Sequence, residues 1–112
     1  MKTISIAKDF SVTPGARYEQ EGPFPGKEFR EKFLSPVIKQ ALKSQSKLIV
    51  DLDGTAGLGT SFLEESFGGL IREDKLPYDQ VIKILDFKSE ENPDYIVEIK
   101  QYMKEAYEKL SN

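Results

Sequence analysis

The glycine-rich turn Gly54–Ser61 (GTAGLGTS) is the segment of this sequence whose residue types and spacing come closest to a chemical motif. It differs from the phosphate-binding pattern G-x-x-x-x-G-K-S/T only at Thr60, which stands where the pattern has lysine. Because that lysine contacts the terminal phosphates, its loss argues against a nucleoside triphosphatase. Backbone amides at a helix start still attract anions, including a phosphate on a partner or one added to Ser61 or Thr60.

The composition narrows the chemistry that the chain can perform. Its 112 residues include no cysteine and no histidine, so serine–histidine and cysteine–histidine catalysis are excluded, as are zinc sites built on these residues. Any metal would have to be a hard, oxygen-bound ion such as magnesium. The length fits a single domain over residues 1–112, and 38% hydrophobic with 31% charged residues is an ordinary soluble balance.

The net charge of −3 argues against a nucleic acid as the partner. Basic residues gather between positions 27 and 43, but Glu28 and Glu31 are interleaved with them, which is typical of a solvated helix face. The first residues lack the apolar core of a signal peptide, and the apolar runs are too short to span a membrane. We therefore expect a cytoplasmic protein that binds neither membrane nor nucleic acid.

Two aspartates follow a hydrophobic run just before the turn. The segment Ile49–Thr55 (IVDLDGT) resembles the first motif of haloacid-dehalogenase-like phosphatases. That resemblance implies a magnesium-dependent phosphotransferase with Asp51 as nucleophile and Asp53 as acid and base. The family also needs a later lysine-bearing element and a second acidic pair on another strand. Glu90 and Glu91 stand just before a predicted helix start, so the sequence has no convincing second acidic site. In the alternative interpretation, Asp51 and Asp53 accept hydrogen bonds from loop amides or face solvent at a strand end.

The elements that position the turn are predicted from hydrophobic spacing. Lys47–Asp53 is short and nearly continuous in apolar character, as strands buried on both faces are. After the turn, apolar residues predict a helix to about Arg72, with Ser61 and Glu64 spaced as a capping box. Gly68 and Gly69 weaken this helix by about 1 kcal/mol each, which suggests close packing against the sheet or a partner.

The remaining segments complete an alternation of strands and helices. The patterns predict a strand at Thr3–Lys8, then a long loop at Ser11–Gly26 with a short strand at Ala16–Glu19, and a helix at Lys27–Ser44 kinked or broken near Ser35 by Pro36. They further predict a connector at Lys75–Gln80, a strand at Val81–Phe87 that a helical turn can precede, and a helix from Asn92-Pro93 to the C-terminus. This order predicts an α/β fold: a small, open, mixed and mostly parallel sheet of about four strands, with helices packed on it.

Several motifs in the same order resemble a known family. The motifs are Gly15–Tyr18, Gly22–Gly26, Phe29–Arg30, Val50–Gly54, Gly59–Glu65 and Phe67–Leu70. Together they look like the STAS-like domain family of unknown function, over about residues 11–102. That family is similar to STAS domains, the anti-sigma-factor antagonists of bacteria, which bind histidine-kinase-like ATPases and are switched by phosphorylation. The resemblance implies a non-enzymatic regulatory module without a cofactor.

The STAS signature also implies which residues form the site. Its two hydroxyl residues fall on Thr60 and Ser61, the candidate phosphorylation sites, whereas its preceding aspartate falls on Gly59 and its following Gly-Leu on Phe62-Leu63. The alternative is that Ser61 only caps its helix. The candidate partner-binding residues are Gly57, Gly59, Thr60, Ser61, Glu64, Glu65, Gly68 and Gly69. Arg17 and Tyr18 of the long loop, with Arg30, form a second candidate surface that folds over the turn. In the alternative interpretation, these residues only anchor the loop, through arginine hydrogen bonds and tyrosine packing.

Overall fold

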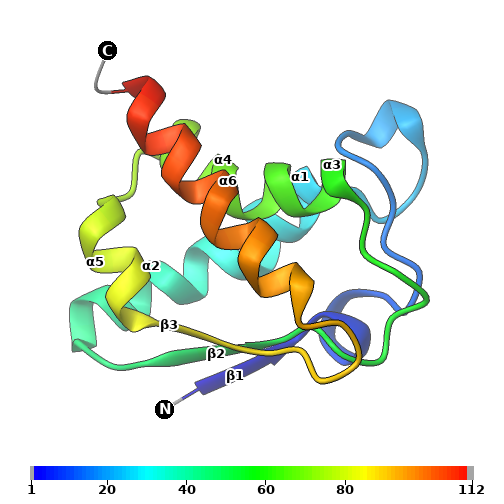
Figure 1. Ribbon diagram of the computed structural model, residues 1–112, viewed down its shortest axis with the longest axis horizontal. Coiled ribbons are helices and arrows are strands. Elements are labelled where there is room, and N and C mark those ends of the chain that lie inside the picture. Colours follow the sequence, from blue (N-terminus) through cyan, green and yellow to red (C-terminus); the bar gives the residue numbers. More distant parts are fainter. Residues whose placement is uncertain (1, 111–112) are drawn as a thin grey trace.

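The computed structural model describes residues 2–110 and contains a parallel sheet with the strand order β1-β2-β3 (Figure 1). The strands are β1 (Lys2–Ser5), β2 (Leu48–Asp51) and β3 (Leu85–Lys88). Lys2 pairs with Leu48, and Leu48 pairs with Leu85, so the three strands begin level with one another. The α/β class and the open parallel sheet are confirmed, but the described residues form three strands rather than about four, and all of them are parallel.

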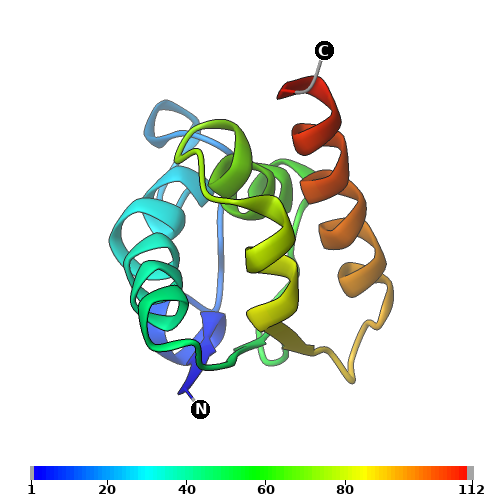
Figure 2. The same ribbon diagram turned by 90° about the vertical axis from the view of Figure 1, so that its left-hand side faces the viewer.

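The helices lie on one face of this sheet (Figures 1 and 2). Right-handed crossovers between strands taken in the order β1, β2, β3 place each connecting helix on the same side. Ile4 and Val50 are therefore buried under the helices, whereas Thr3 and Asp86 point to the other face and are exposed. The prediction that β2 is buried on both faces is wrong, because Ile49 is only half-buried.

β1 is shorter than the predicted strand, because a wide helical turn, η1 (Ile6–Phe10), follows it. The Ser5 hydroxyl accepts a hydrogen bond from the Lys8 amide at 3.1 Å, and the Asp9 carboxylate accepts one from the Ser5 amide at 2.8 Å. These two side chains end the strand at Ser5. No strand forms within Ala16–Glu19 either, where the chain instead leads into the 3-10 turn η2 (Glu19–Glu21).

Helical structure runs from Gly26 to Ser44 as α1 (Gly26–Phe29), the π turn η3 (Arg30–Leu34) and α2 (Ser35–Ser44). The predicted kink or break near Ser35 takes the form of this π turn. The Ser35 amide donates to the Arg30 carbonyl, five residues back, and Pro36 then stands in the first turn of α2. A widened turn accommodates the proline ring that would clash inside a regular helix.

The helix after the glycine-rich turn comprises α3 (Thr60–Leu63), η4 (Glu64–Gly68) and α4 (Gly69–Arg72). The next element, α5 (Tyr78–Ile84), corrects two predictions, because it begins inside the expected connector and occupies the first half of the expected strand Val81–Phe87. Pro77 precedes its first residue and Val81 is its buried position. Only Leu85–Lys88 remain as strand.

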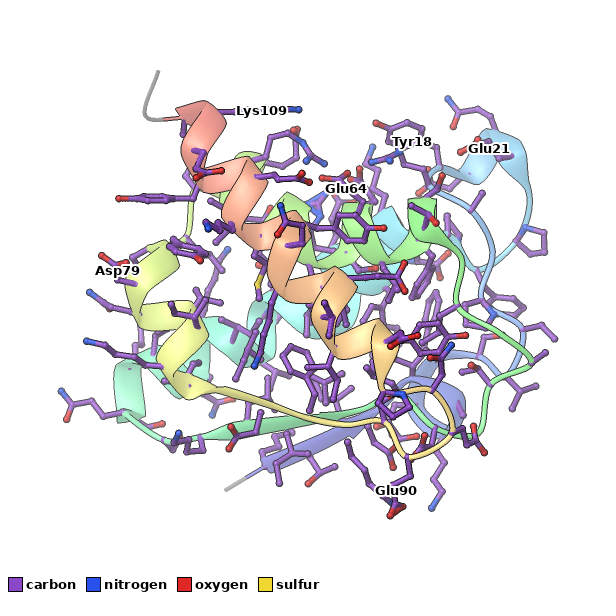
Figure 3. The ribbon with its side chains drawn as sticks, viewed as in Figure 1. Tyr18, Glu21, Glu64, Asp79, Glu90 and Lys109 are labelled. Atoms are coloured by element: carbon purple, nitrogen blue, oxygen red, sulfur yellow. The ribbon has the colours of Figure 1, made fainter. Side chains whose placement is uncertain are left out.

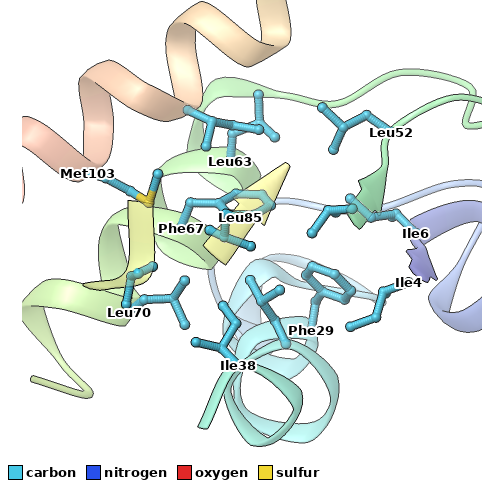
Figure 4. Packing of buried hydrophobic residues seen from close by; sticks show 14 of the residues in the cluster. Ile4, Ile6, Phe29, Ile38, Leu52, Leu63, Phe67, Leu70, Leu85 and Met103 are labelled. Carbon is cyan, nitrogen blue, oxygen red and sulfur yellow. The ribbon is translucent and has the colours of Figure 1, made fainter. Parts of the chain in front are cut away.

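The last helix, α6 (Asp94–Leu110), begins as predicted. The Asn92 side chain accepts a hydrogen bond from the Asp94 amide at 3.1 Å, which is N-cap geometry. Ile99, Met103 and Ala106 are its buried positions and belong to the hydrophobic core. Figure 4 shows Met103 among the buried side chains of this core. Among residues 2–110, the helices are all too short or too polar to cross a lipid bilayer.

Candidate functional site

The glycine-rich turn leaves the carboxyl end of β2 and is held in place from both sides. The Ala56 amide donates to the Val12 carbonyl at 2.7 Å, so the long loop 11–25 begins against the turn. On the other side, the Leu58 amide donates to the Tyr95 hydroxyl of α6 at 3.1 Å, and the Gly54 amide to the Glu91 carboxylate at 2.8 Å. The turn therefore has a fixed backbone, although Gly57 and Gly59 are exposed.

The two aspartates before the turn fasten the chain locally. An Asp51 carboxylate oxygen accepts a hydrogen bond from the Asp53 amide at 2.9 Å. The Asp53 carboxylate accepts from the Glu90 amide at 3.1 Å and the Glu91 amide at 2.9 Å, and these bonds, with the nearby Lys88, lower the pKa of Asp53 despite some desolvation. The interpretation that these aspartates satisfy loop amides is confirmed. Within residues 2–110, no three carboxylates gather as a metal site.

The helix that follows the turn begins without a side-chain cap. Gly59 occupies the N-cap position, with φ −77° and ψ 160°, and its carbonyl accepts from the Leu63 amide at 3.1 Å. The predicted capping box is wrong, because Ser61 lies inside the first turn and does not precede it. Thr60 is exposed and Ser61 is half-buried. Both hydroxyl residues therefore lie at an uncapped helix start.

A cluster of arginines and carboxylates ties the long loop to two helices. We call it the arginine–carboxylate cluster; its members are Arg17, Arg30, Arg72, Glu64, Glu65 and Asp74. Arg17 pairs with Glu64 and, at 3.2 Å, with Glu65. Glu65 also binds Arg30 at 2.9 Å and Arg72 at 3.3 Å, so one carboxylate joins three cations.

The cluster combines buried and accessible charges. Glu65 and Arg30 are each only 2% exposed, whereas the side chains of Arg17 and Arg72 are 28% and 32% exposed. Burial alone would raise the pKa of Glu64, but hydrogen bonds and charges from Arg72 and Arg17 outweigh it and lower that pKa. The hydrogen bond to Glu64 raises the pKa of Arg17. Glu64 is thus charged, and Arg17 and Arg72 neutralise its charge within the molecule.

The structure brings most of the predicted site residues together. Gly57, Gly59, Thr60, Ser61 and Glu64 follow one another along the turn and the first helical turns, and Arg17 reaches Glu64 from the long loop. In Figure 3, Tyr18 and Glu64 both lie at the end of the molecule away from the sheet. Tyr18 is 42% exposed. The part of the long loop that lies over the turn itself is Val12, whereas Arg17 lies over the helix.

Three of the predicted residues are not on the surface. Glu65, Gly68 and Gly69 are buried. A Cβ atom at Gly69 would lie 2.7 Å from Arg30 Nε, and one at Gly68 would lie 2.5 Å from a Glu64 carboxylate oxygen. The close packing inferred from these two glycines is real, but its cause is the arginine–carboxylate cluster within the chain. Neither the sheet nor a partner is needed to explain it.

Sequence reasoning missed two members of the cluster, Arg72 and Asp74. Arg72 follows Glu64 and Glu65 by eight and seven residues, which is two helical turns and places all three on one side of the helix. That spacing could have indicated Arg72. Asp74 binds Arg30 at 3.1 Å across 44 positions of sequence, and no local pattern could have indicated this pair.

A family model described as "STAS-like domain of unknown function (DUF4325)" matches residues 26–95, more than half of the chain. No curated protein and no solved structure matches. The matched range runs from α1 to the first turn of α6 and includes β2, the glycine-rich turn and the helix after it. The resemblance stated from the sequence motifs is confirmed over this range.

Proposed function

Because the chain belongs to the family of STAS-like domains, we propose that it is a non-enzymatic regulatory module that binds a protein partner at the glycine-rich turn. The binding site is the turn surface, which we define as Gly57, Gly59, Thr60, Ser61 and Glu64 with the adjoining Arg17 and Tyr18. The partner class that the resemblance implies is a histidine-kinase-like ATPase in the cytoplasm of a bacterium.

The observation that carries this proposal is a turn that is accessible but held in a fixed shape. Hydrogen bonds to Val12, Glu91 and Tyr95 hold its backbone from both sides, while its glycines and Thr60 face solvent. A preorganised surface loses little conformational entropy when a partner binds. The aspartates that an enzyme of this motif would use are instead engaged by loop amides, which supports recognition over turnover.

Phosphorylation of Ser61 or Thr60 is the regulatory step that we propose for this surface. A phosphate adds about −1.5 to −2 charge and is favoured at a helix N-terminus. Glu64 and Glu65 stand close by in sequence, but Arg17, Arg30 and Arg72 neutralise them. The uncapped helix start at Gly59 would add favourable backbone amides.

Site-specific photocrosslinking in the native host tests the partner and its location together. A photoreactive residue replaces Thr60 in one strain and Lys39, an exposed residue of α2, in a control strain. We expect mass spectrometry to identify an ATPase of this type in the Thr60 adduct and not in the Lys39 adduct. With purified proteins, Thr60→Arg should weaken binding at least about tenfold, while Lys39→Glu should leave it unchanged.

Two results would overturn the proposal. One is ATPase binding that Thr60→Arg does not weaken, since the turn surface would then lie outside the interface. The other is magnesium-dependent hydrolysis of a phosphate ester that Asp51→Asn abolishes, since the chain would then be an enzyme. Gly68 is unsuitable for an interface variant, because its position is buried beside Glu64 and α6.

A further inference from the structure

β3 forms an outer edge of the sheet, and among residues 2–110 no further strand lies beside it. The Lys88 carbonyl accepts a hydrogen bond from the Leu52 amide at 2.8 Å, so residue 88 directs its backbone groups toward the rest of the sheet. Because these groups alternate in direction along a strand, the amide and carbonyl of Phe87 point outward. Such an open edge is a template for another strand.

An apolar groove lies along this edge. It has a volume of about 250 Å³ and is lined by Tyr78, Ile82, Leu85, Phe87, Lys100 and Met103. These residues come from α5, β3 and α6, which Figures 1 and 2 show together on one side of the molecule. Ile82 is 42% exposed although it is a large aliphatic side chain. A strand added beside β3 would direct alternate side chains toward the helices and so into this groove.

Lys100 is the charged residue of this groove. Its ammonium group forms no ion pair with any carboxylate in the described range, and it projects from α6 beside the buried Met103. An acidic side chain in the added strand would complement this cation at the apolar groove. The ligand that fits this surface is an extended peptide segment. It would pair with the open backbone groups of β3, place apolar side chains in the groove and bring an acidic side chain near Lys100.

We propose that the β3 edge binds an extended segment of a partner protein as an additional parallel or antiparallel strand. The segment places apolar side chains in the groove and an acidic side chain near Lys100. Main-chain hydrogen bonds to Phe87 supply affinity, and the groove selects the sequence. This surface shares no residue with the turn surface and does not depend on the function proposed for it.

A second copy of the chain fits this edge less well. Figure 2 shows α6 on the outer side of β3, so pairing two β3 strands about a two-fold axis would bring two α6 helices over one seam. A partner segment without a helix at that position avoids this crowding. The segment would lie beneath α6, next to β3.

The test is a selection from a phage-displayed library of random linear peptides against the purified chain. Ile82→Arg places a charge in the groove, and this variant is used to remove peptides that bind elsewhere on the chain. The control variant is Val97→Glu, at a 69% exposed position of α6 outside the groove. We expect enriched peptides to alternate apolar residues and to carry an acidic one. They should bind the Val97→Glu variant as tightly as they bind the parent protein. Their affinity should be lower by about threefold or more for Lys100→Glu, and by at least tenfold for Ile82→Arg.

Amide hydrogen exchange separates strand addition from simple burial of side chains. Exchange at the Phe87 amide should slow about tenfold when free peptide stands about ten times above its Kd. The proposal is overturned if no peptide distinguishes the parent from Ile82→Arg, or if bound peptides leave Phe87 exchange unchanged. It is also overturned if sedimentation shows a dimer that Ile82→Arg dissociates, because a second copy would then cover the edge. Should Ile82→Arg fail to fold, Lys100→Glu carries the same comparison.

Discussion

Arg30 carries a charge into the interior and is matched there by two carboxylates. It pairs with Glu65 at 2.9 Å and with Asp74 at 3.1 Å while being only 2% exposed. A buried pair of this kind adds little net stability, but removing one partner leaves a costly unpaired charge. Arg30 therefore fixes how α1 and η3 lie against the helix that contains Glu65, more than it strengthens the fold.

Gly69 shows the local consequence, since its missing side chain makes room for Arg30. Alanine gains about 1 kcal/mol of helix propensity over glycine, but its Cβ would lie 2.7 Å from Arg30 Nε and 2.9 Å from Cδ. Because the ion pairs hold the guanidinium in place, the cost of this overpacking exceeds the gain in helix propensity. We expect Gly69→Ala to lower the free energy of unfolding by about 1–2 kcal/mol in urea titrations.

The matched control for this substitution is Gly59→Ser. No atom lies within 4 Å of a Cβ at Gly59, and its extended backbone suits a serine N-cap. This variant should be as stable as the parent or slightly more stable. A Gly69→Ala variant as stable as the parent would contradict the argument from packing.

At the scale of elements, the sequence predicts correctly those helix starts that depend on interactions between residues close in sequence. Asn92-Pro93 starts a helix because an amide side chain and a fixed φ act within a few residues, and the structure has this cap. The region Val81–Phe87 was misjudged because a short apolar run suits a helix and a strand equally well. Here, tertiary packing decides, since Val81 is buried from α5 and Leu85 from β3.

The same distinction holds for the candidate site, whose local features were predictable and whose long-range contacts were not. The turn was recognisable from its glycines, since glycine permits the positive φ found at Gly54 and Gly57. The role of Gly69 was not, because its neighbour Arg30 is 39 positions away, and such contacts leave no local pattern. The pairing of Asp53 with the loop before α6 is likewise long-range.

The hydrogen bonds of Asp53 join the end of β2 to the loop before α6, and their loss should allow this loop to open locally. Asp53→Ala removes the carboxylate that accepts from the Glu90 and Glu91 amides. We expect hydrogen exchange at these two amides to accelerate on the order of tenfold, while exchange in the core of α6 stays unchanged. Asp86→Ala, at an exposed position of β3, is the control and should leave both amides as they are. Unchanged exchange in Asp53→Ala would mean that other contacts hold the loop.

For the molecule as a whole, the hydrogen bonds and ion pairs of two carboxylates predict how stability depends on pH. Glu64 and Asp53 both have pKa values below their ordinary 4.5 and 3.8. Each therefore stabilises the folded state fully at pH above its ordinary value, and this contribution is lost as the pH falls below that value toward the folded-state pKa. We expect the free energy of unfolding to decline as the pH drops below about 4.5.

The variant Glu64→Gln measures how much of this pH dependence of stability comes from the arginine–carboxylate cluster. Because Glu64 is partly open to solvent, its contribution is modest, under about 1 kcal/mol. The variant should be less stable than the parent at pH 7, and the difference should shrink as the pH falls below about 4.5, because the parent then loses the same charge. Urea titrations across this range measure both curves. A difference that stays constant with pH would show that Glu64 acts through packing, and the long loop would then be held by contacts other than its charge pair with Arg17.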